Sequence, residues 1–146
     1  MPTYTAQLSS SASPDVAFAY LAQFDNTAHW DPGVSDAHAE TDGPPALGSV
    51  YAVTVELGAG PEVLRYAITD YAPPNRVVLE AEGTKFRSRD ELTVEPEGTG
   101  SLVSYEARRD LKGLMKVGAP FAGRALRTAG DAAVEGLARE LARLAG

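Results

Sequence analysis

The sequence contains no cysteine and only two histidines. A chain without cysteine has no disulfide, no thiol nucleophile and no thiolate metal site. His29 and His38 are too few for a histidine-based metal site, and neither HExxH nor a comparable spacing occurs. The GxSxG, P-loop and GxGxxG motifs are also absent. We therefore expect no metal, no nucleotide or other cofactor, and no covalent catalysis.

Long apolar runs and an excess of positive charge are absent as well. No stretch approaches the ~20 apolar residues that a membrane helix needs. The first residues, MPTYTAQLSSS, lack the basic and apolar regions of a secretory signal. The formal net charge of −7 repels phosphate backbones and argues against nucleic acid as a partner. With 44% hydrophobic and 23% charged residues, we expect a single globular domain over residues 1–146, located in the cytoplasm.

The beginning of the chain indicates a strand, a helix and a corner. Residues 4–9 alternate apolar and polar side chains, as a strand does. Ser13 can cap a helix that opens with proline, and apolar residues at helical spacing predict that helix over residues 13–24. A short further turn leads to HWDPG at 29–33, where Pro and Gly end the helical region.

Six further strands and a long helix are predicted after this corner. Apolar residues recur with period two over residues 34–41, 49–57, 62–71, 76–82, 84–95 and 101–109. Short turns between the strands favour an antiparallel meander with one buried face. A helix of about 25 residues opens near Pro120 and, at nearly 40 Å, should lie across most of the sheet and cover that face.

Several segments in this order are similar to the START/Bet v 1-like (SRPBCC) helix-grip superfamily and its polyketide cyclase/dehydrase and lipid transport group. They read SASPDVAFAYLAQFDNTAHWDPGV, DGPPALGSVY, ITDYAPPNRVVLEAEG, DELTVEPEGTGSLVSYEA and GLARELARL. The resemblance implies an α+β fold: a curved antiparallel sheet of about seven strands wrapped around a long C-terminal helix, with one or two short helices after the first strand. It also implies a cavity between sheet and helix. Members bind lipids, sterols, polyketides or plant hormones, and a minority catalyse cyclisation or dehydration.

Ser88 and Asp90 are the sharpest candidates for chemistry. They share one face of a predicted strand with Phe86, Leu92 and Val94, so both should point inward. A carboxylate in an apolar cavity favours its protonated form and could act as a general acid or base. Alternatively, Asp90 lies near the rim, solvated or paired with an arginine. We favour this second interpretation because no second strong acid or base is visible beside it.

Aromatic side chains on the inward faces are the other candidates. Each tyrosine could present a hydroxyl to a ligand, or pack in the core with that hydroxyl satisfied locally. His29 should face solvent, and Asp31 should cap the turn. Arg109 could meet a ligand carboxylate, but we favour a surface position for it. The predicted ligand contacts are Trp30, Tyr51, Val53, Tyr66, Ser88, Asp90, Tyr105 and Phe121.

Four glycines stand in or near the last helix, at positions 118, 123, 130 and 136. They either make room for a ligand or a bend, or let the helix pack closely. Residues 115–123 could form a lid over the pocket mouth. Lys85, Arg87 and Arg89 alternate along one outer face, where we expect cross-strand pairs with Glu80 and Glu82.

Three functions remain open at this point. The first is binding of a small, mostly hydrophobic ligand, of lipid, polyketide or aromatic type, between the sheet and the C-terminal helix. The second is a cyclase or dehydratase that uses Asp90 as its acid/base. The third is an interaction protein that buries the cavity mouth in a homodimer or against a partner enzyme.

Overall fold

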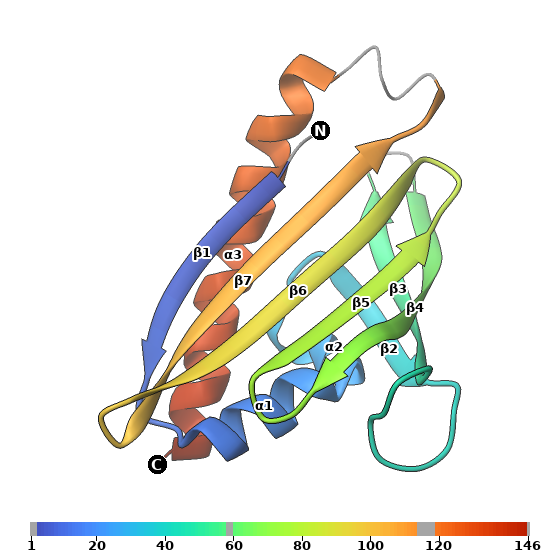
Figure 1. Ribbon diagram of the computed structural model, residues 1–146. Coiled ribbons are helices and arrows are strands. Elements are labelled where there is room, and N and C mark those ends of the chain that lie inside the picture. Colours follow the sequence, from blue (N-terminus) through green and yellow to red (C-terminus); the bar gives the residue numbers. More distant parts are fainter. Residues whose placement is uncertain (1–2, 58–59, 114–118, 146) are drawn as a thin grey trace.

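Seven strands form one antiparallel sheet that curls into a half-barrel (Figure 1). The computed structural model describes residues 3–57, 60–113 and 119–145. Each strand from β2 to β6 pairs with the next strand along the chain, and β1 pairs with β7 at one edge. This architecture confirms the predicted helix-grip fold. The strands are β1 (Thr3–Ser10), β2 (Val34–Ala39), β3 (Val50–Leu57), β4 (Gly60–Ala72), β5 (Arg76–Glu82), β6 (Phe86–Glu97) and β7 (Gly100–Leu111).

The helical elements begin directly after β1. The Ser13 hydroxyl accepts a hydrogen bond from the backbone N–H of Val16 and caps the first helix. At Gln23 the backbone leaves helical geometry, with φ −81° and ψ 84°, so the predicted helix over residues 13–24 is divided. None of the helices in the described ranges is long and apolar enough to cross a membrane. The elements are α1 (Pro14–Ala22), the 3₁₀ turn η1 (Phe24–Asn26), α2 (Thr27–Trp30) and α3 (Ala119–Ala145).

The HWDPG corner joins α2 to β2. One oxygen of Asp31, Oδ1, accepts a hydrogen bond from the backbone N–H of Gly33 at 2.9 Å, which fixes the turn. His29 is exposed, as predicted, and Trp30 is buried with 2% of its surface accessible. The corner therefore turns the chain and inserts one large aromatic side chain into the core.

The concave face of the sheet is covered by several helices together. α3 packs mainly against β1 and α2, whereas α1 lies on β6 and β7, and η1 lies on β2 and β3. The expectation that α3 lies across most of the sheet is wrong, because on the sheet it packs mainly along β1. α1, η1 and α2 occupy the concave face beside α3. Their apolar residues Phe18, Phe24 and Trp30 are buried by packing against the sheet.

Two helix glycines mark close packing of α3. A Cβ on Gly130 would lie 2.6 Å from the ring of Tyr4, whose hydroxyl donates a hydrogen bond of 2.8 Å to Asp131. Burial, and then this hydrogen bond, raise the pKa of Tyr4 to about 12. A Cβ on Gly136 would overlap the carbonyl oxygen of Trp30. At these two positions the glycines serve close packing and not a ligand.

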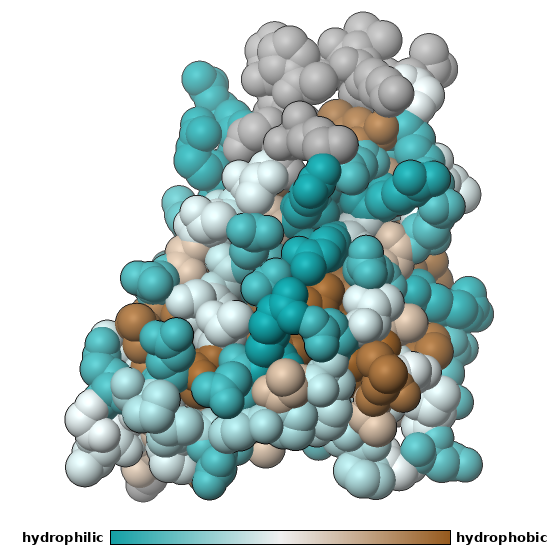
Figure 2. Space-filling model, in the orientation of Figure 1, coloured by the Kyte–Doolittle hydropathy of each residue, from teal (hydrophilic) through white to brown (hydrophobic). Residues whose placement is uncertain are grey.

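The outward face of the sheet carries several ion pairs between neighbouring strands. Figure 2 shows hydrophilic side chains over the strands on this face. Arg87 donates to Glu82, which lies directly opposite on β5, at 2.7 Å, and this confirms one expected cross-strand pair. Arg89 pairs with Glu91 and Glu106 rather than with its direct neighbour Glu80. The expected pairing with glutamates is therefore confirmed for Arg87, whereas Arg89 has other partners than expected.

Gly136→Ala should lower the melting temperature, although alanine is the better helix former by about 1 kcal/mol. The added methyl meets the backbone of α2, which cannot rotate away, and overpacking of this kind costs about 2 kcal/mol. Thermal unfolding followed by circular dichroism measures the change. Ala138→Gly, at an exposed position of the same helix, shows the propensity effect alone. A higher melting temperature for Gly136→Ala would contradict the close contact.

Candidate functional site

The inward face of β6 carries polar residues within an apolar row. Its burial alternates along the strand, so Ser88 and Asp90 point inward together with Phe86 and Leu92. Only 2% of Ser88 and 3% of Asp90 is accessible. Because buried carboxylates need a partner, the surroundings of Asp90 decide what it can do.

Asp90 forms a buried ion pair with Arg109. The Nη1 group of Arg109 donates to Oδ1 of Asp90 at 2.8 Å, and the two side chains are 21% and 4% exposed. Asp90 lies opposite Ala107 on β7, so Arg109 is its diagonal neighbour on the same face. The expected surface position of Arg109 is wrong. Burial lowers the pKa of Arg109, but the charge of Asp90, the neighbouring Tyr66 and Tyr105 and the Asp90 hydrogen bond together raise it well above normal.

A second polar contact lies beside this pair. The hydroxyls of Tyr66 and Ser88 are 2.6 Å apart in a buried hydrogen bond. Ala81, directly opposite Ser88 on the intervening strand β5, is short enough to let Tyr66 reach across from β4. Burial raises the pKa of Tyr66, so its hydroxyl stays protonated at neutral pH. The hydroxyl is therefore a stable donor or acceptor for a neighbouring group.

The polar residues and the helical corner enclose a small cavity of about 30 Å³. This volume takes a water-sized group. Its wall combines apolar side chains with the Asp90–Arg109 pair and the Tyr66 ring. The lining residues are Phe24, Thr27, Trp30, Asp31, Val34, Val53, Val55, Tyr66, Asp90 and Arg109.

Asp31 brings a second carboxylate to this cavity. Burial raises its pKa; the Gly33 N–H and the Arg109 charge act in the opposite direction, and the charge of Asp90 adds to the rise. The residue that fixes the HWDPG corner is thus also part of the site. Alternation within strands could not indicate this, because Asp31 lies in a turn between α2 and β2.

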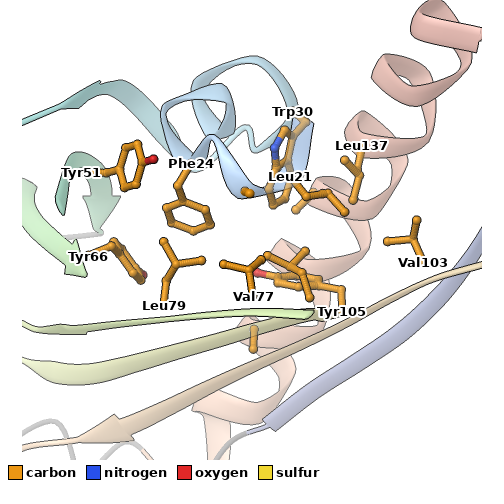
Figure 3. Packing of buried hydrophobic residues seen from close by; sticks show 14 of the residues in the cluster. Leu21, Phe24, Trp30, Tyr51, Tyr66, Val77, Leu79, Val103, Tyr105 and Leu137 are labelled. Atoms are coloured by element: carbon orange, nitrogen blue, oxygen red, sulfur yellow. The ribbon is translucent and has the colours of Figure 1, made fainter. Parts of the chain in front are cut away.

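Aromatic rings pack on one another in the core beside the cavity, and Figure 3 shows these rings among the buried side chains. Phe24 lies between two tyrosines, with ring centroids 6.4 Å from Tyr51 and 5.0 Å from Tyr66. Trp30 meets Tyr105 edge to face at 5.9 Å. Burial is the main cause that raises the pKa of Tyr51 and that of Tyr105. Tyr51 and Tyr105 thus do not line the cavity themselves. They pack against Phe24 and Trp30, which do line it.

The residues predicted as ligand contacts fall into three groups. Trp30, Val53, Tyr66 and Asp90 line the cavity. Ser88 reaches it through Tyr66, and Tyr51 and Tyr105 lie behind the ring layer. Gly118 and residues 115–118 of the expected lid lie outside the described part of the structure. Residues 119–123 belong to the start of α3, and the side chain of Phe121 is not described.

Sequence reasoning missed part of the wall. Arg109 continues the alternation of Val103, Tyr105 and Ala107 along β7, and this alternation alone indicates that its side chain points inward. Phe24 follows the helical spacing of apolar residues, which predicts a core position but does not indicate a ligand site. Among the described residues, no group of three or more histidine, aspartate or glutamate side chains is placed to hold a metal ion.

The family model described as polyketide cyclase/dehydrase and lipid transport matches residues 1–145. The chain belongs to this family. No protein with a curated description matches this sequence.

Solved structures share the START-like fold of this family member at low sequence identity. A START superfamily protein from Mycobacterium smegmatis is 18% identical, with a TM-score of 0.73 over 95% of this chain and 98% of that one. A protein from Thermus thermophilus is 14% identical, with a TM-score of 0.79 over 99% and 100%. The di-domain ARO/CYC StfQ from the steffimycin biosynthetic pathway is 17% identical, with a TM-score of 0.75. The match spans 98% of this chain and 50% of StfQ.

Arg109→Met should destabilise this family member by about 2 kcal/mol, because it leaves the Asp90 carboxylate buried without its partner. This loss is smaller than for a fully buried ion pair, because the side chain of Arg109 is 21% exposed. Urea unfolding measures the free energy of unfolding. Adding Asp90→Leu to the same chain should restore most of it, since an apolar pair replaces the ion pair. Equal stability of the wild type and Arg109→Met would show that the pair contributes nothing.

Asp31→Asn should raise the melting temperature at neutral pH and lose this advantage in acid. Burial raises the folded-state pKa of Asp31, so its ionised form costs stability above that pKa. The cost disappears below the unfolded-state value of about 3.9, where both states are protonated. Asparagine keeps an oxygen for Gly33. Melting curves between about pH 3.5 and 7 test this, with exposed Asp36→Asn as the control. A difference independent of pH would contradict it.

Proposed function

We propose that this protein binds a small, mostly hydrophobic ligand of lipid, polyketide or aromatic type inside the half-barrel. The polar end of the ligand lies in the cavity beside Asp90 and Arg109, and its apolar body lies between the sheet and the helices. The contacts proposed are Trp30, Val53, Tyr66, Asp90 and, from α3, Phe121, with Ser88, Tyr51 and Tyr105 supporting them.

The observation that carries this proposal is the buried Asp90–Arg109 pair on the inward face of the sheet. Taking two charges out of water is costly, and an apolar pair of similar volume often gives equal or greater stability. Charged groups buried within an otherwise apolar core are typical of functional sites. Pockets for small molecules combine apolar walls with a few placed polar groups, as this cavity does.

The family supports the class of ligand. Its description names polyketides and lipids, and both are largely apolar molecules with few oxygen atoms. The cavity described is smaller than such a ligand, so the proposal requires the rings and helices around it to shift when the ligand enters. A cytoplasmic location and a homodimer remain predictions of the sequence.

Filling the cavity by one methylene group should weaken ligand binding. Val55 lines the cavity on β3, and Val55→Ile keeps the β-branched side chain that a strand favours. Nile red, a neutral apolar dye, serves as the probe, and its fluorescence in a titration gives the affinity. We expect a loss of about tenfold, since one methylene in a pocket has an effect of this size.

The matched control is Val63→Ile, at an outward position on β4 that is 49% exposed. It should bind Nile red like the wild type. Absence of saturable binding to the wild type, or equal losses in both variants, would overturn the proposal. Circular dichroism of both variants confirms that they are folded.

A second candidate function is catalysis of cyclisation or dehydration, with Asp90 as the acid/base. The observation that favours it is the presence of Asp31 and Asp90 on one cavity wall, where one group can donate and the other accept a proton. Asp90→Asn still accepts a hydrogen bond from Arg109. In an enzyme this variant would bind Nile red normally but fail to convert a poly-β-ketone substrate. Unchanged turnover would exclude Asp90.

A further inference from the structure

The charges on the cavity wall do not balance. Two carboxylates, Asp31 and Asp90, face one guanidinium, that of Arg109. The guanidinium is already engaged with Asp90 at 2.8 Å. An incoming anion would therefore meet a wall whose single positive charge is shared, with a second carboxylate beside it. Like charges brought together in a desolvated site oppose binding.

Hydrogen-bonding capacity remains on both sides of the cavity. In the described part of the chain, Asp31 and Asp90 each accept their hydrogen bond through Oδ1, from Gly33 and Arg109 respectively. Each carboxylate retains Oδ2 as an acceptor. Both hydrogen bonds of Arg109 in the same residue ranges start from Nη1, one of them to the carbonyl of Arg108. Nε and Nη2 therefore remain as donors.

The space beside these groups is small. About 30 Å³ takes a group of the size of water, with one oxygen atom. A carboxylate has two oxygens and carries its own hydration, which a cavity of this size cannot replace. A hydroxyl fits both the volume and the partners, since it donates one hydrogen bond and accepts others.

From this juxtaposition we propose that the polar end of the ligand is a neutral hydroxyl, of an alcohol, a phenol or an enol, and that Asp31 selects it against a carboxylate. The hydroxyl donates to Oδ2 of Asp31 or Asp90 and accepts from Arg109. This inference rests on the proposed ligand-binding function and adds the chemical class of the ligand. It also gives Asp31 a role in specificity beyond fixing the corner.

The test compares two probes of equal chain length, 1-decanol and decanoate, near pH 7.5, where a carboxylic acid with a pKa of about 4 to 5 is ionised. Each probe displaces Nile red from the wild-type protein. Emission of Trp30, the single tryptophan of the chain and part of the cavity wall, provides a second readout. We expect decanol to bind at least about tenfold more tightly than decanoate.

The variant Asp31→Asn removes one negative charge and keeps the oxygen that fixes the turn. It should reduce the preference for decanol by about tenfold, mainly through tighter binding of decanoate. Asp36→Asn removes a charge at an exposed position of β2, with 66% of its side chain accessible, and should leave the preference unchanged. This control separates the local effect from the change in net charge.

The outcomes distinguish this inference from the function on which it rests. If neither Nile red nor either probe binds, the proposed function fails and the inference fails with it. If the dye binds and decanoate equals or exceeds decanol, only the hydroxyl preference is overturned. If Asp31→Asn and Asp36→Asn change the preference equally, Asp31 does not select the ligand.

Discussion

The contact between α3 and α2 at Gly136 holds the concave side of this molecule together. There the two backbones approach so closely that no side chain fits between them. α3 packs on the sheet mainly along β1, so most of the concave face depends on α1, η1 and α2 for its cover. Because Trp30 belongs to α2 and lines the cavity, the position of α3 determines where the wall of the site lies.

The site is built at the boundary between two kinds of structure. Strands supply Tyr66, Asp90 and Arg109 in positions set by pairing register, and such positions are rigid. The short helices and the corner supply Trp30 and Asp31 through local turns. Groups that must hold a fixed geometry are thus on the sheet, while the opposite wall consists of short helical elements and a turn.

Much of this arrangement could be predicted from the sequence. The period of two in the strands and the capped helix after Ser13 indicated the order of the elements, and the inward position of Asp90 followed from alternation with Phe86 and Leu92. Arg109 obeys the same alternation, but its charge and its place near the strand end suggested the surface. Charge is a poor guide to direction when the partner lies on another strand, nineteen positions away.

Other features depend on contacts that no local pattern contains. Gly136 meets Trp30 across more than a hundred positions, and a glycine in a helix indicates close packing, a bend or ligand space equally well. Asp31 has the sequence of a turn residue and performs that function. It lies beside two other charged groups only because β6 and β7 bring Asp90 and Arg109 to the same cavity.

The pairing of β1 with β7 has a consequence for how the molecule assembles. Every pair from β2 to β7 joins neighbours along the chain, whereas Thr3 of β1 lies opposite Arg108. Closing so long a loop costs more chain entropy than closing a hairpin, and contacts of this kind slow folding. We therefore expect the hairpins of the meander to form before the β1 edge. Tyr4 of β1 contacts Gly130 and Asp131 of α3, so the place of the first strand and that of the last helix depend on each other.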